Sequence, residues 1–208
     1  MGIYRDHILP FLTDRLLAGA DYVDLRREAC TGLQGRVLEI GFGSGLNLPF
    51  FGSTVREVFA IEPAPGAWQL AAKRLRACPI PVRRIGNDAQ VIPLEEASVD
   101  AVLMTWVLCS LPDQAAALRE IHRVLKPGGK LHFVEHGLAE SPSLARWQHR
   151  LTPLQKIMAG GCRLDTDVTA MLDAAGFSTE GIQRIPYPGF RLAGAQYLGI
   201  CGKSGKSA

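Results

Sequence analysis

The chain has 208 residues, of which 47% are hydrophobic and 21% are charged, and these proportions are typical of a single soluble globular domain. Its 23 basic and 20 acidic residues leave a formal net charge of +3, which is too small to favour a nucleic acid as partner. No apolar run approaches the ~20 residues of a membrane span, no signal peptide is visible, and the five cysteines have no zinc-ligand spacing, so we expect a reduced, cytoplasmic protein without a metal.

The first predicted helix covers residues 4–17. Ile8, Leu9, Leu12 and Leu16 recur at helical spacing, and polar side chains lie opposite them. This helix precedes the alternating strands and helices described below. Three roles are open to it: a lid over a functional site, a support that packs on the core, or a weak membrane-surface helix. Of these we favour the lid.

A glycine-rich turn follows the apolar run Val37–Ile40, with glycines at alternate positions 41, 43 and 45. Buried parallel strands read as continuous apolar runs, and glycines just beyond a strand let the backbone turn sharply beside a ligand. Leu46 stands where a dinucleotide fingerprint has its third glycine. Glu39, inside the strand, would repel a pyrophosphate but attract an ammonium or sulfonium group. The turn therefore predicts a nucleoside site of another kind.

Two further acidic residues follow strand-like runs. Glu62 ends the run Val58–Ile61 and comes about 20 residues after the first glycine, the spacing expected for a carboxylate that holds a ribose diol. Asp88 follows the run Val82–Ile85 and suits the edge of an adenine-sized base. An exposed strand-end glutamate and an Asx turn at Asp88 are the plainer alternatives, and the Asx turn is compatible with base binding.

The rest of the chain alternates between predicted helices and strands. Asp113 is expected to cap a helix that the proline and glycines of 126–129 stop, and Asp165 or Thr166 to cap one that ends near Ala175. The other elements are expected at Pro65–Ala77 (helix), Asp100–Met104, Lys130–Val134, Thr179–Ile185 and Gln196–Cys201 (strands). This alternation predicts an α/β fold with a mostly parallel sheet, helices on both faces, and ligands at the carboxyl ends of the strands.

The ordered motifs at residues 38–45, Glu62, 88–93, 98–100 and 123–129 resemble those of class I S-adenosylmethionine-dependent methyltransferases, and most closely the type 11 group. The segments 107–110, 134–136, 147–148 and 160–164 are similar to the methyltransferase-like 7 group, which methylates small alkyl thiols. The resemblance implies a single domain over residues 1–208, with a Rossmann-like sheet of seven strands and a cofactor-binding core at 35–137. Residues 1–27 are mixed polar where that group has a membrane anchor, so peripheral membrane contact is the most that we expect.

The resemblance also implies roles for individual residues toward S-adenosylmethionine. The glycines would pack against its methionine part, Glu39 would lie near its ammonium, Glu62 would hold its ribose, and Asp88 with Ala89 would read its adenine. Thr105 and Trp106 would line the cofactor and acceptor pocket. The full implied set of cofactor-binding residues is Tyr4, Glu39, Gly41, Gly43, Gly45, Asn47, Glu62, Pro63, Asp88, Ala89, Thr105 and Trp106.

The expected reaction is methyl transfer to a small hydrophobic acceptor, for which a thiol is the best candidate. C- or O-methylation of a quinone-like or lipid metabolite and a cofactor-binding subunit without catalysis are the alternatives. His136, just past a strand, is the expected base, since histidine titrates near neutral pH. Residues 1–30 would form the lid, and the insertion at 141–164 an apolar wall of the acceptor pocket. The sequence does not predict the oligomeric state.

Overall fold

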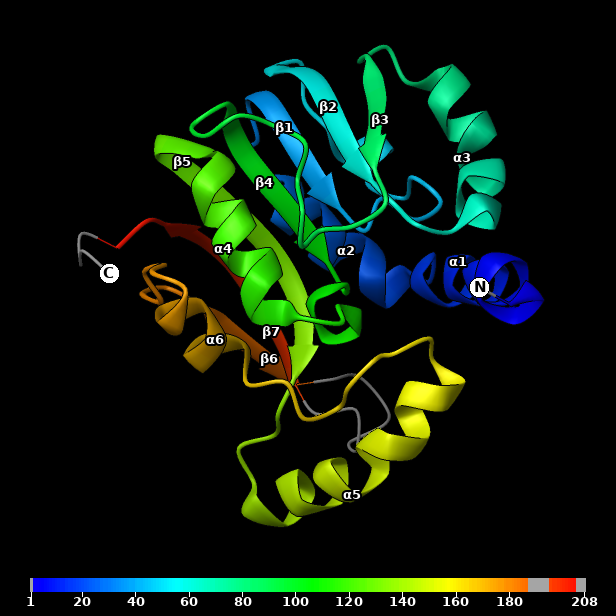
Figure 1. Ribbon diagram of the computed structural model, residues 1–208, viewed down its shortest axis with the longest axis vertical. Helices are drawn as coiled ribbons and strands as arrows, with labels where there is room; N and C mark the ends of the chain where they lie inside the picture. Colours follow the sequence, from blue (N-terminus) through cyan, green and yellow to red (C-terminus); the bar gives the residue numbers. More distant parts are fainter. Residues whose placement is uncertain (1, 187–194, 205–208) are drawn as a thin grey trace.

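Seven strands form one sheet in the computed structural model, which describes residues 2–186 and 195–204 (Figure 1). Their order is β3-β2-β1-β4-β5-β7-β6. β1 to β5 pair in parallel, whereas β7 runs antiparallel to both of its neighbours. The predicted seven-stranded, mostly parallel sheet is confirmed. The strands are β1 (Gly35–Ile40), β2 (Val55–Ile61), β3 (Val82–Gly86), β4 (Val99–Thr105), β5 (Leu125–Gly137), β6 (Gln183–Pro186) and β7 (Ala195–Gly202).

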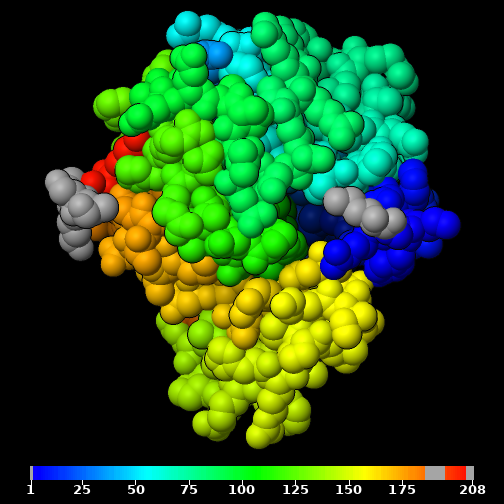
Figure 2. All heavy atoms as spheres, in the orientation of Figure 1, coloured from blue at the N-terminus to red at the C-terminus, as the bar shows by residue number. Residues whose placement is uncertain are grey.

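Helices cover both faces of the sheet. Buried side chains of α2 and α3 pack on one face, and those of α4 and α6 pack on the other. α5 stands apart and, with the loop after it, forms a lobe below the sheet (Figure 2). The helices are η1 (a π-helical turn, Tyr4–Ile8), α1 (Leu9–Leu17), α2 (Ala20–Cys30), η2 (Leu48–Phe50), α3 (Pro65–Ala77), η3 (Leu108–Ser110), α4 (Gln114–Val124), α5 (Pro142–Met158) and α6 (Val168–Ala174).

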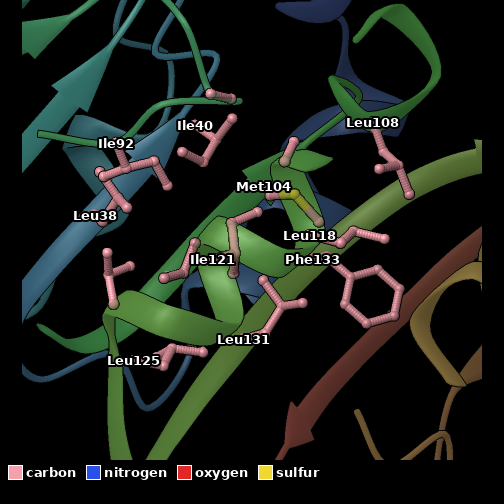
Figure 3. Packing of buried hydrophobic residues seen from close by; sticks show 14 of the residues in the cluster. Leu38, Ile40, Ile92, Met104, Leu108, Leu118, Ile121, Leu125, Leu131 and Phe133 are labelled. Carbon is pink, nitrogen blue, oxygen red and sulfur yellow. The ribbon is translucent and has the colours of Figure 1, made fainter. Parts of the chain in front are cut away.

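The largest part of the core lies between the sheet and α4. Leu38 and Ile40 of β1 and Met104 of β4 point toward Leu118 and Ile121 of α4 (Figure 3). Side chains alternate along a strand, so the other residues of β1 face α2. Glu39 therefore lies on the α2 side of the sheet, which decides its polar partners.

Local side chains account for most element boundaries. Asp113 caps α4 as predicted, since its Oδ1 accepts a hydrogen bond from Ala116 N at 2.9 Å. The prediction that Asp165 or Thr166 caps the helix that ends near Ala175 is wrong. Asp167 caps α6 instead, because its carboxylate accepts from Ala170 N at 3.0 Å.

The topology marks one edge of the sheet for ligands. The strand order reverses between β1 and β4, and the carboxyl ends of these strands flank the crevice where ligands of open α/β sheets bind. Over residues 2–186 and 195–204, no helix is both long and apolar enough to cross a membrane.

Candidate functional site

A cavity of about 530 Å³ lies at the carboxyl ends of β1, β2 and β4. Such a volume is typical of a site for a small molecule or cofactor. Its lining comes from the N-terminal segment and α2, from the loops after β1 to β4, and from one glycine beyond α5. Nine of the predicted cofactor-binding residues line it: Gly41, Gly43, Asn47, Glu62, Pro63, Asp88, Ala89, Thr105 and Trp106. Tyr4, Glu39, Gly45 and the predicted base His136 do not.

The glycine loop forms the cavity wall after β1. Gly41 has φ +69°, and a Cβ on it would lie 2.4 Å from Val107 Cγ2, so the position accepts no larger residue without movement. Gly45 also has a positive φ, +75°, but it turns the chain behind the lining instead of facing the cavity.

Glu62 connects the glycine loop to the start of α3. Its Oε2 accepts from Gly43 N at 2.9 Å and its Oε1 accepts from Ala64 N at 2.8 Å. Burial raises the pKa of this carboxyl, and both backbone hydrogen bonds oppose the rise. Each carboxylate oxygen can accept a second hydrogen bond, so the oriented group retains capacity for two hydroxyls.

Asp88 lies at the far end of the cavity, after β3. Its Oδ1 accepts from the backbone N of Gln90 at 2.8 Å and from the Gln90 side chain at 2.9 Å. The Asx turn that the sequence suggested is therefore present. Because Asp88 and Ala89 also line the cavity, the turn presents this edge of the loop to a ligand.

A buried polar cluster lies beneath the opposite end. Asn47 Nδ2 donates to Glu39 Oε1 at 2.6 Å and to Thr105 Oγ1 at 3.1 Å, and Asn47 Oδ1 accepts from Arg26 Nη1 at 2.7 Å. Glu39 is fully buried, and its Oε2 has no partner among the described residues. Burial raises the pKa of Glu39 to about 8, and burial also lowers the pKa of Arg26 to about 10.

Arg26 is the functional residue that sequence reasoning missed. It comes from α2, outside every recognised motif, and it lines the cavity although only 4% of the residue is exposed. Its Cζ lies 4.8 Å from the centre of the Trp106 ring, an arrangement typical of a cation–π contact. The two adjacent arginines of this polar helix carry no sequence signal that tells which one is buried.

Trp106 has an unusual backbone, with φ +53° in a residue that is not glycine. Its Nε1 donates to Gln196 Oε1 at 2.8 Å, and Tyr22 packs edge-on against its ring at 5.2 Å. Such strain persists only where neighbours hold it, and it is common at ligand sites. The contacts fix the indole at the cavity wall.

The N-terminal helices border the cavity, and α1 is bonded to the glycine loop. Asp14 Oδ1 accepts from Ser44 Oγ at 2.6 Å and forms an ion pair with Arg74 at 2.9 Å. Tyr4 belongs to the expected set of cofactor-binding residues, but it is exposed and its hydroxyl donates to Met158 O. The π-helical turn of η1 directs this side chain toward the end of α5 and away from the cavity lining.

The predicted base and the predicted acceptor wall lie elsewhere than expected. His136 Nε2 is 3.0 Å from Cys162 Sγ, which lies outside the cavity lining, as His136 does. The insertion reaches the cavity only through Gly160. Its side chains Trp147, Leu154 and Ile157 are exposed, because α5 stands apart from the sheet. The role of His136 as a base stays a prediction for which this arrangement offers no direct path to an acceptor.

Comparisons with known proteins agree with this geometry. The model of a methyltransferase domain family matches residues 38–133. The human thiol S-methyltransferase TMT1A is 33% identical over 156 residues, which cover 73% of this chain and 64% of that protein. Human thiol S-methyltransferase TMT1B is 33% identical over 167 residues, covering 77% and 68%. The chain thus spans about two thirds of the length of these relatives. The solved structure of a methyltransferase from Thermotoga maritima superposes with a TM-score of 0.67 at 22% identity, over 97% of both chains.

Proposed function

The chain belongs to the family of S-adenosylmethionine-dependent methyltransferases that includes the human thiol S-methyltransferases, and we propose that it methylates the sulfur of a small hydrophobic thiol. The observation that carries the proposal is one cavity that has a nucleoside-type wall and several apolar side chains, and that lies beside the buried cluster of Glu39, Asn47 and Arg26. C- or O-methylation of a quinone-like or lipid acceptor is the alternative to be tested against it.

The cavity residues fit the cofactor along its length. We assign Asp88 and Ala89 to the adenine, Glu62 to the ribose hydroxyls, and the glycine loop to the methionine part. Two glycines support this assignment. Gly41 keeps the loop against Val107, where a Cβ would lie 2.4 Å from Cγ2, and at Gly43, which lines the cavity, a Cβ would meet only Gly41 O at 3.8 Å. When bound, S-adenosylmethionine supplies a methyl group that its sulfonium has already made electrophilic.

The buried charges suit the amino-acid end of this cofactor, which carries an ammonium and a carboxylate. Glu39 Oε2 is the free acceptor beneath this end, and we assign it to the ammonium, directly or through a water. Arg26 lines the cavity and supplies the cation that a carboxylate requires. Asn47 bonds to both residues and holds them at a set separation.

Several apolar side chains of the remaining lining, beside the charged Arg5, Asp6 and Asp14, favour an apolar acceptor. Leu9 and Leu17 of α1, Val107 and Leu111 after β4, and Pro112 contribute side chains without charge. Such a wall excludes water from the reacting atoms and leaves the acceptor to be held by its hydrocarbon part. A small hydrophobic thiol has this character.

Positioning is the main contribution that these residues make to the reaction. The thiol proton would pass to solvent or a base, the acceptor sulfur would attack the methyl carbon as a thiolate, and the bond from that carbon to the cofactor sulfur would break as the new bond forms. Alignment of the two groups contributes up to ~7–11 kcal/mol, whereas ionising a thiol of pKa ~8.5 at pH 7 costs only about 2 kcal/mol. A dedicated base is therefore of secondary importance.

We further propose that η1 and α1, the first part of the predicted lid at residues 1–30, act as a lid, whereas α2 packs its buried residues on the sheet and stays with the core. The support for it is that α1 lines the cavity and is attached through Asp14, by a hydrogen bond from Ser44 of the glycine loop and an ion pair with Arg74 of α3. A segment held by so few polar contacts is expected to open and close at a low cost in free energy as ligands enter and leave.

A matched panel of acceptors tests the proposed function. An alkyl thiol, the alcohol of the same skeleton and a hydroquinone of similar size are each incubated with the full chain and S-adenosylmethionine, and formation of S-adenosylhomocysteine is measured. We expect turnover with the thiol alone. Turnover with the hydroquinone or alcohol while every thiol fails would contradict the thiol proposal and leave family membership intact.

A further inference from the structure

Three potential metal ligands from distant parts of the chain meet beside the cavity. They are Cys109 of η3, His136 near the end of β5, and Cys162 in the loop after α5. Cys162 Sγ lies 3.0 Å from His136 Nε2 and 3.4 Å from Cys109 Sγ, and one donor atom from each residue lies within 4.8 Å of the others. Sequence spacing did not reveal this group, because Cys162 is 26 positions from His136 and 53 positions from Cys109.

We propose that this thiol–imidazole cluster, Cys109, His136 and Cys162, binds one soft divalent cation of the Zn²⁺ type. Thiolate and imidazole are the ligands that such cations prefer over the oxygen ligands of Mg²⁺ or Ca²⁺. Two thiolates and a neutral imidazole balance the charge of a divalent ion. A set of two cysteines and one histidine also matches three-ligand zinc sites, which keep a fourth position for water or another ligand.

Two of the three donor separations require little rearrangement, and the third, between Cys109 and His136, is at most 4.8 Å. Around a tetrahedral zinc with bonds of ~2.3 Å to sulfur and ~2.0–2.1 Å to nitrogen, two sulfurs lie about 3.8 Å apart and a sulfur and a nitrogen about 3.6 Å apart. The present separations of 3.4 Å and 3.0 Å are shorter by a few tenths of an ångström. The side chains need to open slightly to admit the ion.

The backbone around the cluster supports such a site. Arg163 N donates to Cys109 O at 3.0 Å, which holds the two cysteine segments side by side. Gly160 and Gly161 precede Cys162 with φ +63° and +110°, so the chain makes a turn there that favours glycine and presents the thiol to the cluster.

The polar atoms of the cluster have few partners besides one another. Cys109 Sγ also lies 3.6 Å from Ser110 Oγ, and His136 Nδ1 is buried with no hydrogen-bond partner in the described parts of the chain. Buried polar groups without partners are uncommon and call for an explanation. Glu135 is the nearest acidic neighbour in sequence, and its Oε1 is already bonded to the backbone N of Val107 and of Leu108.

A cation in this site would have a structural consequence for the cavity. Ser110 and Gly160 both line the cavity, and each is within two residues of a ligand of the cluster. Coordination would join the loop after β4 to the loop after α5 and fix this part of the wall. The inference concerns binding of the ion and does not depend on the methyl acceptor.

Metal binding by the full chain tests the proposal without the cofactor. The reduced protein, stripped with a chelator and desalted, is titrated with Co²⁺, and the site is then challenged with Zn²⁺. We expect one equivalent of Co²⁺ with sulfur-to-metal charge-transfer absorption that Zn²⁺ abolishes. Cys109→Ser and Cys162→Ser should each weaken Zn²⁺ binding more than about 100-fold, since loss of an outer-sphere partner alone costs 10–100-fold.

Cys78→Ser is the matched control, because Cys78 is a half-buried free cysteine elsewhere in the fold. It should bind the ion as the wild type does. Far-ultraviolet circular dichroism in the presence of chelator identifies any variant that does not fold, and His136→Gln then carries the comparison. The proposal would be overturned if the wild type bound no stoichiometric metal, or if Cys78→Ser lost binding as much as the cluster variants. It would also be overturned if Cys109 and Cys162 formed a disulfide in the metal-free protein.

Discussion

Replacing Glu39 with glutamine should remove a pH dependence from cofactor binding. Glu39 is fully buried, and burial raises its pKa to about 8, so the free protein holds the carboxyl largely protonated at pH 6 to 7. A cofactor ammonium near Oε2 favours the ionised form. Binding must then release a proton, and the affinity of the wild type must rise with pH toward 8.

The size of this effect follows from the difference between the pH of the solution and the pKa of Glu39. At pH 6, about two units below the pKa of Glu39, ionisation costs about 2.7 kcal/mol, which is ~100-fold in the dissociation constant. We therefore expect affinity to improve about tenfold per pH unit between 6 and 7.5. Glu39→Gln keeps an acceptor for Asn47 Nδ2 but cannot ionise, so its affinity should stay flat over that range.

Titration calorimetry in buffers of different ionisation enthalpy measures both the affinity and the proton released. Wild-type binding that is flat with pH, or Glu39→Gln binding that rises as the wild type does, would refute the reasoning. Denaturant unfolding gives an independent check. Between pH 4.5 and 8 the native state binds the extra proton of Glu39, so wild-type stability should fall with rising pH relative to the variant, by at most about 5 kcal/mol.

Three further substitutions test other parts of the cavity. Glu62→Gln should weaken cofactor binding by about 1–3 kcal/mol, which calorimetry would show as a 5- to 150-fold rise in the dissociation constant; unchanged affinity would remove Glu62 from the site. Gly41→Ala places a Cβ 2.4 Å from a neighbouring side-chain carbon and should lower stability more than Gly128→Ala. Gly128 has a similar positive φ but open space around it, so only the backbone cost of ~1–2 kcal/mol applies there. Equal losses in denaturant unfolding would contradict the close packing at Gly41. Asp14→Ala removes both the hydrogen bond from Ser44 and the ion pair with Arg74, and it should lower turnover several-fold, whereas Asp24→Ala, in an exposed pair, should not; equal rates would argue against a lid.

Much of the cofactor half of the site was predictable because its signals are local. The apolar run of β1, the glycines after it and Glu62 at the end of β2 each lie at a strand end, and parallel strands bring their carboxyl ends to one edge. Burial of Glu39 followed from its place within a continuous apolar run. The Asx turn at Asp88 was predictable for the same reason, since its hydrogen bond spans only two residues.

The parts that escaped prediction depend on contacts between distant segments. Nothing near Arg26 distinguishes it from the exposed arginine that follows it, and only the packing of α2 on the sheet buries it. The direction of Tyr4 depends on a π-helical turn with no sequence signal. Cys109 and Cys162 each read as an isolated cysteine, and the course of the chain after α5 brings them together.

The most direct test of the central claim is a single-turnover experiment with S-adenosylmethionine that carries an isotopically labelled methyl group. The full chain, in excess over the cofactor, is mixed with an alkyl thiol, and mass spectrometry follows the label. The account predicts that the label appears stoichiometrically in the methyl thioether, with S-adenosylhomocysteine as the other product. Tight cofactor binding with no labelled thioether would contradict it and would favour a cofactor-binding subunit or a different acceptor.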